Sequence, residues 1–149
     1  FMSLEKDVMT QMKAAMKAKD AAALEALRAV KSAILLAKTE NSQQDLSEEE
    51  EIKILQKLVK QRKDSAILYR EQNREDLAEP EEKQAEVIAQ FLPEQLSEAE
   101  IEAKVEEIIS QTGAEGMKDM GKVMGLASKE LAGKADGKTI SMIVKKKLA

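Results

Sequence analysis

Hydrophobic side chains recur at intervals of three and four residues along almost the whole 149-residue chain, and this spacing marks one face of a helix. Only three residues are aromatic, whereas sheets favour aromatic and β-branched side chains. No segment keeps the two-residue alternation of a strand. We therefore predict an all-α fold, with cores built from Leu, Ile, Val, Ala and Met.

The first two helices are predicted from residues that commonly cap helix N-termini, Ser3 and Asp20. The first helix would turn inward Leu4, Val8, Met12, Ala15 and Met16. The second would turn inward Leu24, Leu27, Val30, Ile34 and Leu35. The polar segment 41–45 is predicted to be a loop.

A capping box, formed by Ser47 with Glu50 three residues later, opens the longest predicted helix, about residues 48–76. The acidic run 48–51 fits the positive end of the helix dipole, and cation binding is the alternative interpretation. A fourth helix is predicted to start at Pro80, where the missing N–H costs nothing. Its apolar face would carry Ala85, Ile88, Ala89 and Leu92.

Helical spacing also predicts a basic stripe along the long helix, beside its apolar face. The apolar face carries Ile52, Leu55, Leu58, Val59, Ala66 and Tyr69. The stripe consists of Lys53, Lys60, Lys63, Arg70 and Arg74, and it is flanked by Asp64, Glu71 and Glu75. We interpret it as a solvated, ion-paired face, and a binding surface is the alternative. Arg62 falls in the apolar sector, where it either anchors a buried ion pair or extends to the helix edge.

A boundary between two domains is predicted at 93–96, which we assign as a linker between residues 2–92 and 97–149. The N-terminal domain would be four hairpin-like helices and the C-terminal domain three short ones. Ser97 and Glu100 repeat the capping box, and Gly113 is a natural C-terminal stop. A further helix is expected at 117–131. A last helix would begin near Asp136 and turn inward Ile140, Ile143, Val144 and Leu148.

Glycine and charge set the C-terminal part apart. All six glycines lie within residues 113–137. Residues 97–115 carry a net charge of -5 and residues 116–149 a net charge of +5, although the whole chain is acidic at -4. This asymmetry predicts a locally basic surface on an acidic protein.

The segment 118–125 places Gly121 and Gly125 four residues apart on one helix face. Such spacing lets another backbone approach, either a neighbouring helix or a phosphate chain. The segment lacks the strand and the Gly-Lys-Ser/Thr ending of a phosphate loop. The methionines at 117, 120 and 124 recur at helical spacing, so we interpret them as adaptable core filler.

The segment 133–138 predicts a tight turn, with Gly133 and Gly137 flanking Asp136 as the cap of the last helix. Lys134 and Lys138 bracket this turn, so its helix N-terminus is a candidate phosphate site. The alternative is that these lysines only solubilise the surface. The run 145–147 is basic and either solvated or in contact with an acidic partner.

Composition excludes several kinds of chemistry. The chain has no Cys and no His, so thiolate nucleophiles, disulfides and His-dependent triads are absent. We predict no catalytic residue, no metal site and no cofactor, although a Ser–Lys dyad stays open. No apolar run reaches the roughly 18 residues of a membrane span, so we expect a cytoplasmic protein with no membrane partner.

Five segments resemble the YqeY-like proteins, small bacterial proteins of this length. They are 60–65 (Lys-Gln-Arg-Lys-Asp-Ser), 74–77 (Arg-Glu-Asp-Leu), 91–97 (Phe-Leu-Pro-Glu-Gln-Leu-Ser), 118–125 and 133–138. Asn73 departs from the family, where a small residue, often Gly, precedes the Arg. The part 97–149 is also similar to the tail domain of the B subunit of the aspartyl/glutamyl-tRNA amidotransferase.

This resemblance implies contact with tRNA, or with a tRNA amidotransferase or aminoacyl-tRNA complex, and no contact with DNA. The amidotransferase tail contacts tRNA, while amide transfer occurs in a separate catalytic region that this chain does not resemble. Lysines that would lie near phosphates are Lys118, Lys122, Lys134 and Lys138, extended by Lys145 and Lys146. Two alternatives stay open: participation in carbon–nitrogen ligation with glutamine as nitrogen donor, and a helical adaptor for protein partners.

Overall fold

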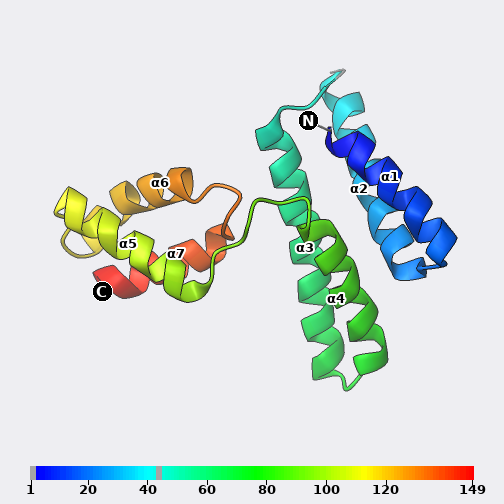
Figure 1. Cartoon of the computed structure of the whole chain (residues 1–149). Coiled ribbons are helices and arrows are strands. Elements are labelled where there is room, and N and C mark those ends of the chain that lie inside the picture. The colour runs from blue at the N-terminus through cyan, green and yellow to red at the C-terminus, as the bar shows by residue number, and fades with distance from the viewer. Residues whose placement is uncertain (1–2, 43–44) are drawn as a thin grey trace. The chain divides into compact units, whose positions relative to one another are not determined.

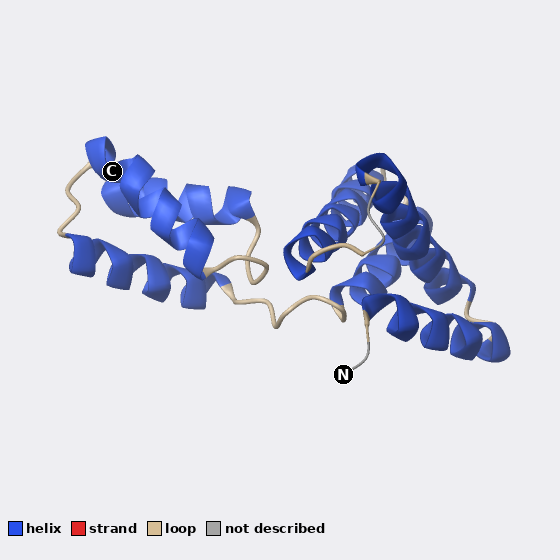
Figure 2. Cartoon of the chain, turned by 90° about the horizontal axis from the view of Figure 1, so that it is seen from above, coloured by secondary structure: helices blue, strands red, loops and turns tan. Residues whose placement is uncertain are grey.

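The computed structural model describes residues 3–42 and 45–149, and within these ranges the regular elements are all helices (Figure 2). They form two compact units, Phe1–Leu92 and Pro93–Ala149. The first unit contains α1 (Leu4–Ala18), α2 (Ala21–Asn41), α3 (Glu48–Glu71) and α4 (Glu75–Ala89) (Figure 1). The second contains α5 (Glu98–Thr112), a 3-10 turn (Met117–Asp119), α6 (Met120–Glu130) and α7 (Gly137–Leu148). The prediction of an all-α chain is confirmed.

The N-terminal caps lie where the sequence predicted them. The hydroxyl of Ser3 accepts a hydrogen bond from the N–H of Lys6, and the carboxylate of Asp20 accepts one from Ala23. Ser47 and Glu50 form a complete capping box, with each side chain bonded to the other's backbone N–H. These bonds satisfy donors that a helix leaves unpaired, which is why short polar side chains define helix starts. Of the predicted loop 41–45, residues 43–44 lie outside the described residues.

Ten buried residues from all four helices form the core of the first unit: Val8, Ala15, Ala26, Leu27, Val30, Ile34, Leu55, Val59, Ala85 and Ile88. Two predictions of the inward face are wrong, because Met16 and Leu35 are 58% and 63% exposed. The backbone of α1 packs on α2, whereas α2 also packs on α3 and α4. No other helix of the described residues therefore packs on the outer edge of the α1–α2 pair.

The predicted helix 48–76 is wrong at its C-terminal end. The helix α3 ends at Glu71, the backbone turns through Asn73 at φ +60°, and α4 begins at Glu75. The Arg74 N–H donates to the Tyr69 carbonyl at 2.8 Å, which closes the reversal. Asn adopts left-handed geometry more readily than most residues. Asn73 can therefore form this turn, although the family resemblance leads us to expect a small residue here.

The prediction that α4 starts at Pro80 is wrong, because Pro80 lies inside this helix. The helix begins five residues earlier, because the turn at Asn73 returns the chain directly into it. Proline removes one backbone donor within a helix, a cost that tertiary packing must offset. Here α4 packs along α3, and the buried residues Ala78, Ala85 and Ile88 lie on its inner side.

The second unit has its own core of eleven buried residues: Ile101, Val105, Ile108, Val123, Ala127, Leu131, Ala135, Ile140, Ile143, Val144 and Leu148. The capping box of Ser97 and Glu100 is present, and α5 stops at Gly113 with φ +67°. The predicted helix 117–131 begins instead as the 3-10 turn and continues as α6. Met117 is 45% exposed, so its assignment as core filler is wrong.

Part of the predicted linker 93–96 is bonded into this second unit. The Leu96 N–H donates to the Lys134 carbonyl at 2.9 Å, and the Gln95 side chain donates to the Gly133 carbonyl at 2.7 Å. Leu96 also packs against the core of the second unit. That residues 2–92 and 97–149 are separately folding domains stays a prediction.

Candidate nucleic-acid interface

The exposed face of α6 carries lysines and glycines. Val123 and Ala127 are fully buried and define its inner side. At about 100° per residue, Lys122, Gly125 and Lys129 lie on the opposite side. All three are exposed, as is Lys118 in the preceding 3-10 turn. Lys129 was absent from the predicted set, although its seven-residue distance from Lys122 repeats the helical period and could have revealed it.

Gly121 and Gly125 face open space. A Cβ atom added at either position would meet nothing within 4 Å, and neither residue has a left-handed backbone. The interpretation that a neighbouring helix packs on them is therefore wrong for the helices of the second unit. The alternative, that a phosphate chain approaches this bare backbone, stays a prediction.

The turn between α6 and α7 needs only one of its two glycines. Gly133 is buried with φ +77°, a geometry that favours glycine. Gly137 is instead the first residue of α7 with an ordinary helical backbone, so its predicted role in the turn is wrong. Asp136 caps α7 as predicted, since its carboxylate accepts the Lys138 N–H at 3.4 Å and the Thr139 hydroxyl at 3.4 Å.

This cap changes the predicted phosphate site at the start of α7. The carboxylate of Asp136 already occupies the positive end of the helix dipole, where an anion would otherwise bind. Lys134 and Lys138 stay exposed on either side of it. A phosphate at this end would therefore be held by lysine side chains and not by the helix N-terminus.

The basic run 145–147 is partly neutralised. Lys146 lies 3.7 Å from Glu102, and Lys147 donates a 2.6 Å hydrogen bond to Glu106, both acids being on α5. This contact raises the pKa of Lys147 above its usual value. Of the six predicted lysines, Lys146 is thus engaged within the fold. The other five make no ion pair with any residue in the described ranges: Lys118, Lys122, Lys134, Lys138 and Lys145.

These five lysines lie near the two ends of the α6–α7 pair. The two helices pack together and run in opposite directions (Figure 1). Lys118 and Lys122 lie at the N-terminal end of α6. The C-terminal end of α7, which carries Lys145, lies at the same end of the helix pair. Lys134 and Lys138 lie at the other end of the pair. The two ends are separated by the length of α6, which is eleven residues or about 16 Å.

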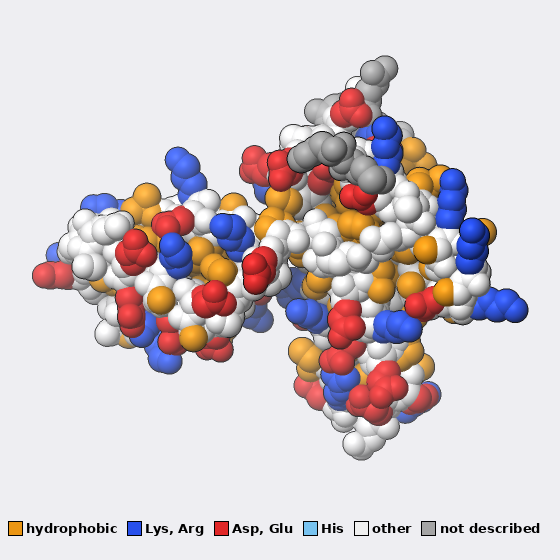
Figure 3. All heavy atoms as spheres, viewed as in Figure 1, with side chains coloured by type: hydrophobic (Ala, Val, Ile, Leu, Met, Phe, Trp, Pro, Cys, Tyr) orange, Lys and Arg blue, Asp and Glu red, His pale blue; other side chains and the backbone are white. Residues whose placement is uncertain are grey.

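Four of the five residues of the predicted basic stripe form ion pairs, although Arg74 lies at the start of α4 and not on α3. Lys60 pairs with Asp64 at 2.9 Å, and Arg70 binds both Glu75 and Glu82. These contacts keep the pKa of Arg70 above its usual range and the pKa of Glu82 below it. Figure 3 shows blue and red side chains interspersed over the tip where α3 meets α4.

Arg62 has a partner that neither alternative anticipated. Its Nε donates to the side-chain oxygen of Gln84 at 2.9 Å, and its Nη1 donates to the Leu58 carbonyl at 3.1 Å. Gln84 is only 6% exposed, so this is a polar link between α3 and α4 and not a surface contact. No signal in the sequence joins these two residues.

No group of three or more acidic side chains in the described ranges is arranged to hold a metal ion. In the same ranges, no helix has the length and apolar character that crossing a bilayer requires. The absence of a catalytic residue stays a prediction.

Comparison with known proteins identifies the family. The model of the Yqey-like protein family matches residues 5–148, nearly the whole chain. The chain belongs to the Yqey-like family. The predicted resemblance is therefore shown, and it holds for both compact units of this Yqey-like protein.

Two kinds of named relative are similar to this Yqey-like chain. The E subunit of the glutamyl-tRNA(Gln) amidotransferase of Thermococcus gammatolerans is 38% identical over 46% of this chain and 12% of its own length. The altered inheritance of mitochondria protein 41 of Lachancea thermotolerans is 36% identical over 73% of this chain and 57% of its own length. That of Meyerozyma guilliermondii is also 36% identical, over 77% of this chain and 61% of its own length.

The chain therefore spans about an eighth of the amidotransferase relative and less than two thirds of the mitochondrial proteins. The names of the latter two place those proteins in mitochondria. The cytoplasmic location expected for this Yqey-like protein stays a prediction.

Proposed function

We propose that this protein binds tRNA, alone or within a tRNA amidotransferase assembly, through its C-terminal unit. The observation that carries the proposal is the exposed face of α6. Its lysines make no ion pair within the described ranges, and a Cβ added at Gly121 or Gly125 beside them would meet none of the described atoms within 4 Å. Backbone recognition of nucleic acid needs unpaired positive charge and close approach. Similarity to part of a glutamyl-tRNA(Gln) amidotransferase supports tRNA as the nucleic acid.

Contact is proposed to begin at Lys118 and Lys122 and to extend to Lys129. Each lysine contributes a charge to a phosphate, while Gly121 and Gly125 let the sugar–phosphate chain approach the helix. The remaining unpaired lysines near the ends of the same helix pair would widen the footprint: Lys134, Lys138 and Lys145.

Base stacking is not part of the proposed contact. Residues 97–149 contain no Phe, Tyr or Trp that could stack on an unpaired base. Recognition of the shape and the backbone of the RNA is therefore favoured over stacking on its bases.

The overall charge of -4 opposes tight binding to nucleic acid in general. Recognition would thus depend on a local patch and on the shape of the ligand. The amidotransferase relative is many times longer than its match to this chain, so amide transfer is not part of the proposal. We propose an accessory role beside such an enzyme.

The test is a titration of the whole protein with a folded tRNA at two salt concentrations. We expect binding that weakens with salt, and each lost phosphate contact should lower the slope of log affinity against log salt by about 1. The variants are Lys122→Ala and Lys118→Ala, followed by Lys134→Ala and Lys138→Ala. The matched control is Lys57→Ala, which removes an exposed lysine from α3.

Two results would overturn the proposal. The first is no binding near physiological salt. The second is equal weakening by Lys57→Ala and Lys122→Ala, which would indicate diffuse attraction and not a site. A separate assay with mischarged tRNA, ATP and glutamine tests the enzymatic alternative, and product formed by the purified chain would favour carbon–nitrogen ligation.

A further inference from the structure

A cavity of about 320 Å³ opens between α1 and α2 in the N-terminal unit. Its buried lining consists of Val8 from α1 and Ile34 from α2. Met9 and Leu35 also line it, yet they are 43% and 63% exposed. The cavity is therefore an apolar site open to solvent, and no helix in the described ranges covers it.

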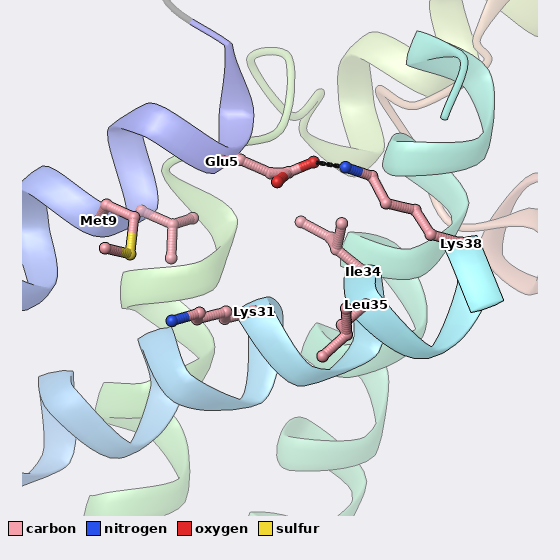
Figure 4. Close-up of a pocket in the computed structure, with 7 residues that line it drawn as sticks. Glu5, Met9, Lys31, Ile34, Leu35 and Lys38 are labelled. Carbon is pink, nitrogen blue, oxygen red and sulfur yellow. Dashed lines mark ion pairs between the residues drawn. The ribbon is translucent and has the colours of Figure 1, made fainter. Parts of the chain in front are cut away.

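The remaining lining residues are charged. In Figure 4, Lys31 reaches from α2 toward α1 on one side of the cavity, and the Glu5–Lys38 ion pair bridges the two helices on another. Lys31 makes no ion pair with any residue in the described ranges, whereas Lys38 is paired. An apolar pocket bordered by an unpaired ammonium group favours a ligand that is apolar and negatively charged.

Apolar side chains continue along α1 beyond the cavity, whereas the facing side of α2 is mixed apolar and basic. On α1, Met9, Met12 and Met16 recur at intervals of three and four residues, so they lie on one side of the helix. On α2, Arg28, Lys31 and Leu35 have the same spacing. Methionine is flexible and polarizable, so a methionine-rich surface adapts to helices of varied sequence.

The charge of this helix pair differs from that of the rest of its unit. Residues 3–42 contain seven basic and five acidic residues, whereas residues 45–92 contain eight basic and thirteen acidic ones. Figure 3 shows Lys and Arg side chains beside hydrophobic ones over α1 and α2. The open apolar groove therefore lies on the basic part of an acidic unit.

We infer that the α1–α2 groove binds an acidic amphipathic helix of a partner protein. An apolar side chain of that helix enters the cavity between Met9 and Leu35, and a neighbouring carboxylate pairs with Lys31. Amphipathic helices commonly bind in apolar grooves through residues spaced i, i+3 or i+4, and i+7. Charge complementarity selects an acidic helix over a basic one. This surface is in the N-terminal unit, so the inference does not depend on tRNA binding.

The experiment uses the whole chain and a fluorescent synthetic helical peptide. The peptide carries leucines spaced i, i+4 and i+7 on one face and glutamates on both flanks. Its control has the same leucines with lysines in place of the glutamates. Anisotropy titrations are expected to show saturable binding of the acidic peptide and, for the lysine peptide, binding weaker by about tenfold or more.

Adjacent leucines provide a matched pair of variants. Leu35 and Leu36 are 63% and 59% exposed, but only Leu35 lines the cavity. Leu35→Glu is expected to weaken binding by about tenfold, and Leu36→Glu to leave it unchanged. Lys31→Glu should weaken binding of the acidic peptide and strengthen binding of the lysine peptide. Circular dichroism confirms that each variant is folded.

Three results would overturn the inference. One is no saturable binding of the acidic peptide, and another is equal loss with Leu35→Glu and Leu36→Glu. The third is occupation by something else: self-association that Leu35→Glu abolishes would assign the groove to a second copy of this chain. Retention on anionic lipid vesicles, abolished by the same variant while the peptide fails to bind, would assign it to a membrane surface.

Discussion

Arg62 donates a 2.9 Å hydrogen bond to the side-chain oxygen of Gln84, which joins α3 to α4 across 22 positions of sequence. Gln84 is buried, and the same guanidinium also donates to the Leu58 carbonyl. Since the partner is an amide and not a carboxylate, this link is a hydrogen bond and not an ion pair. The link therefore orients the two helices that pack most extensively in the first unit.

Removing one partner of this link should destabilise the protein. Gln84→Met and Arg62→Met are each expected to lower the free energy of unfolding by about 1–3 kcal/mol, because each removes a bond from a polar group that is buried (Gln84) or half-buried (Arg62). The double variant should lose less than the sum of the two, since both polar groups are then gone. Urea unfolding measures this, with Gln61→Met at an exposed position as the control. Strict additivity would contradict a direct interaction.

The turn between α3 and α4 depends on the left-handed backbone of Asn73. Asn73→Val should destabilise the protein by about 1–2 kcal/mol, because a β-branched residue is strained at positive φ. Asn73→Gly should be neutral or stabilising. Thermal unfolding compares both with Gln72→Val, whose φ of -95° suits any residue. An Asn73→Val protein as stable as the parent would show that the turn has another geometry.

Substitutions at Gly125 should affect the stability of the protein and its binding of tRNA in opposite directions. It lies inside α6 with open space beyond its Cα, so Gly125→Ala is expected to stabilise the protein by about 0.5–1 kcal/mol. If a phosphate chain approaches this face, Gly125→Leu should weaken tRNA binding although the fold remains intact. Ala103→Leu is the control, because Ala103 is an exposed small residue on α5 and not on the glycine-bearing face of α6. Equal binding by Gly125→Leu and the parent would contradict close approach at this residue.

The ionised carboxylate of Glu51 should make the protein less stable at pH 7 than an uncharged glutamine at the same position would. Burial, with the nearby carboxylates of Glu5 and Glu48, raises its pKa above the ordinary 4.5. A carboxyl whose pKa is raised by folding opposes the folded state once it ionises, and this penalty disappears below the unfolded pKa. Glu51→Gln should therefore stabilise the protein increasingly as the pH rises from about 4.5 through the raised pKa.

Urea unfolding at several pH values tests this prediction. Glu49→Gln is the control, because Glu49 is an exposed residue in the same first turn of α3. Both variants lose a charge that favours the helix N-terminus. Glu49→Gln also loses an exposed pair with Lys53, which contributes little, so the difference between the variants mainly reports the environment of Glu51. A stability gain that is independent of pH would show that ionisation of Glu51 is not its cause.

The second unit should fold alone. Its eleven buried core residues all come from Pro93–Ala149, a size near the lower limit for independent folding. A fragment 93–149 is expected to be helical and to unfold cooperatively by circular dichroism. Val144→Ala should abolish or sharply reduce that cooperativity, because Val144 is fully buried. A fragment without cooperative unfolding would contradict the assignment of 97–149 as a separate domain.

Local signals predicted the elements well where they act through neighbours in sequence. Ser3, Asp20, Ser47 and Ser97 cap helices because each accepts a bond from an N–H only three residues away. The same reasoning misplaced the end of α3, since a left-handed Asn is uncommon and its turn requires α4 to fold back. Pro80 was misread for the same reason.

The candidate site shows the same division. That lysines and glycines share one exposed face of α6 follows from helical spacing, and this part was predictable. Whether any helix covers Gly121 and Gly125, and whether Lys146 is free or paired with Glu102, depends on segments that sequence distance separates.

By itself, the sequence determined the helices, most of their starting residues and most residues of the two cores, because hydrogen bonds within a turn and the period of a helix are local properties. The tertiary structure alone decided which faces stayed uncovered. It paired Arg62 with Gln84, left the α1–α2 groove open at Leu35 and left Gly125 bare. Such contacts join side chains far apart in sequence, and only packing brings them together or keeps them apart.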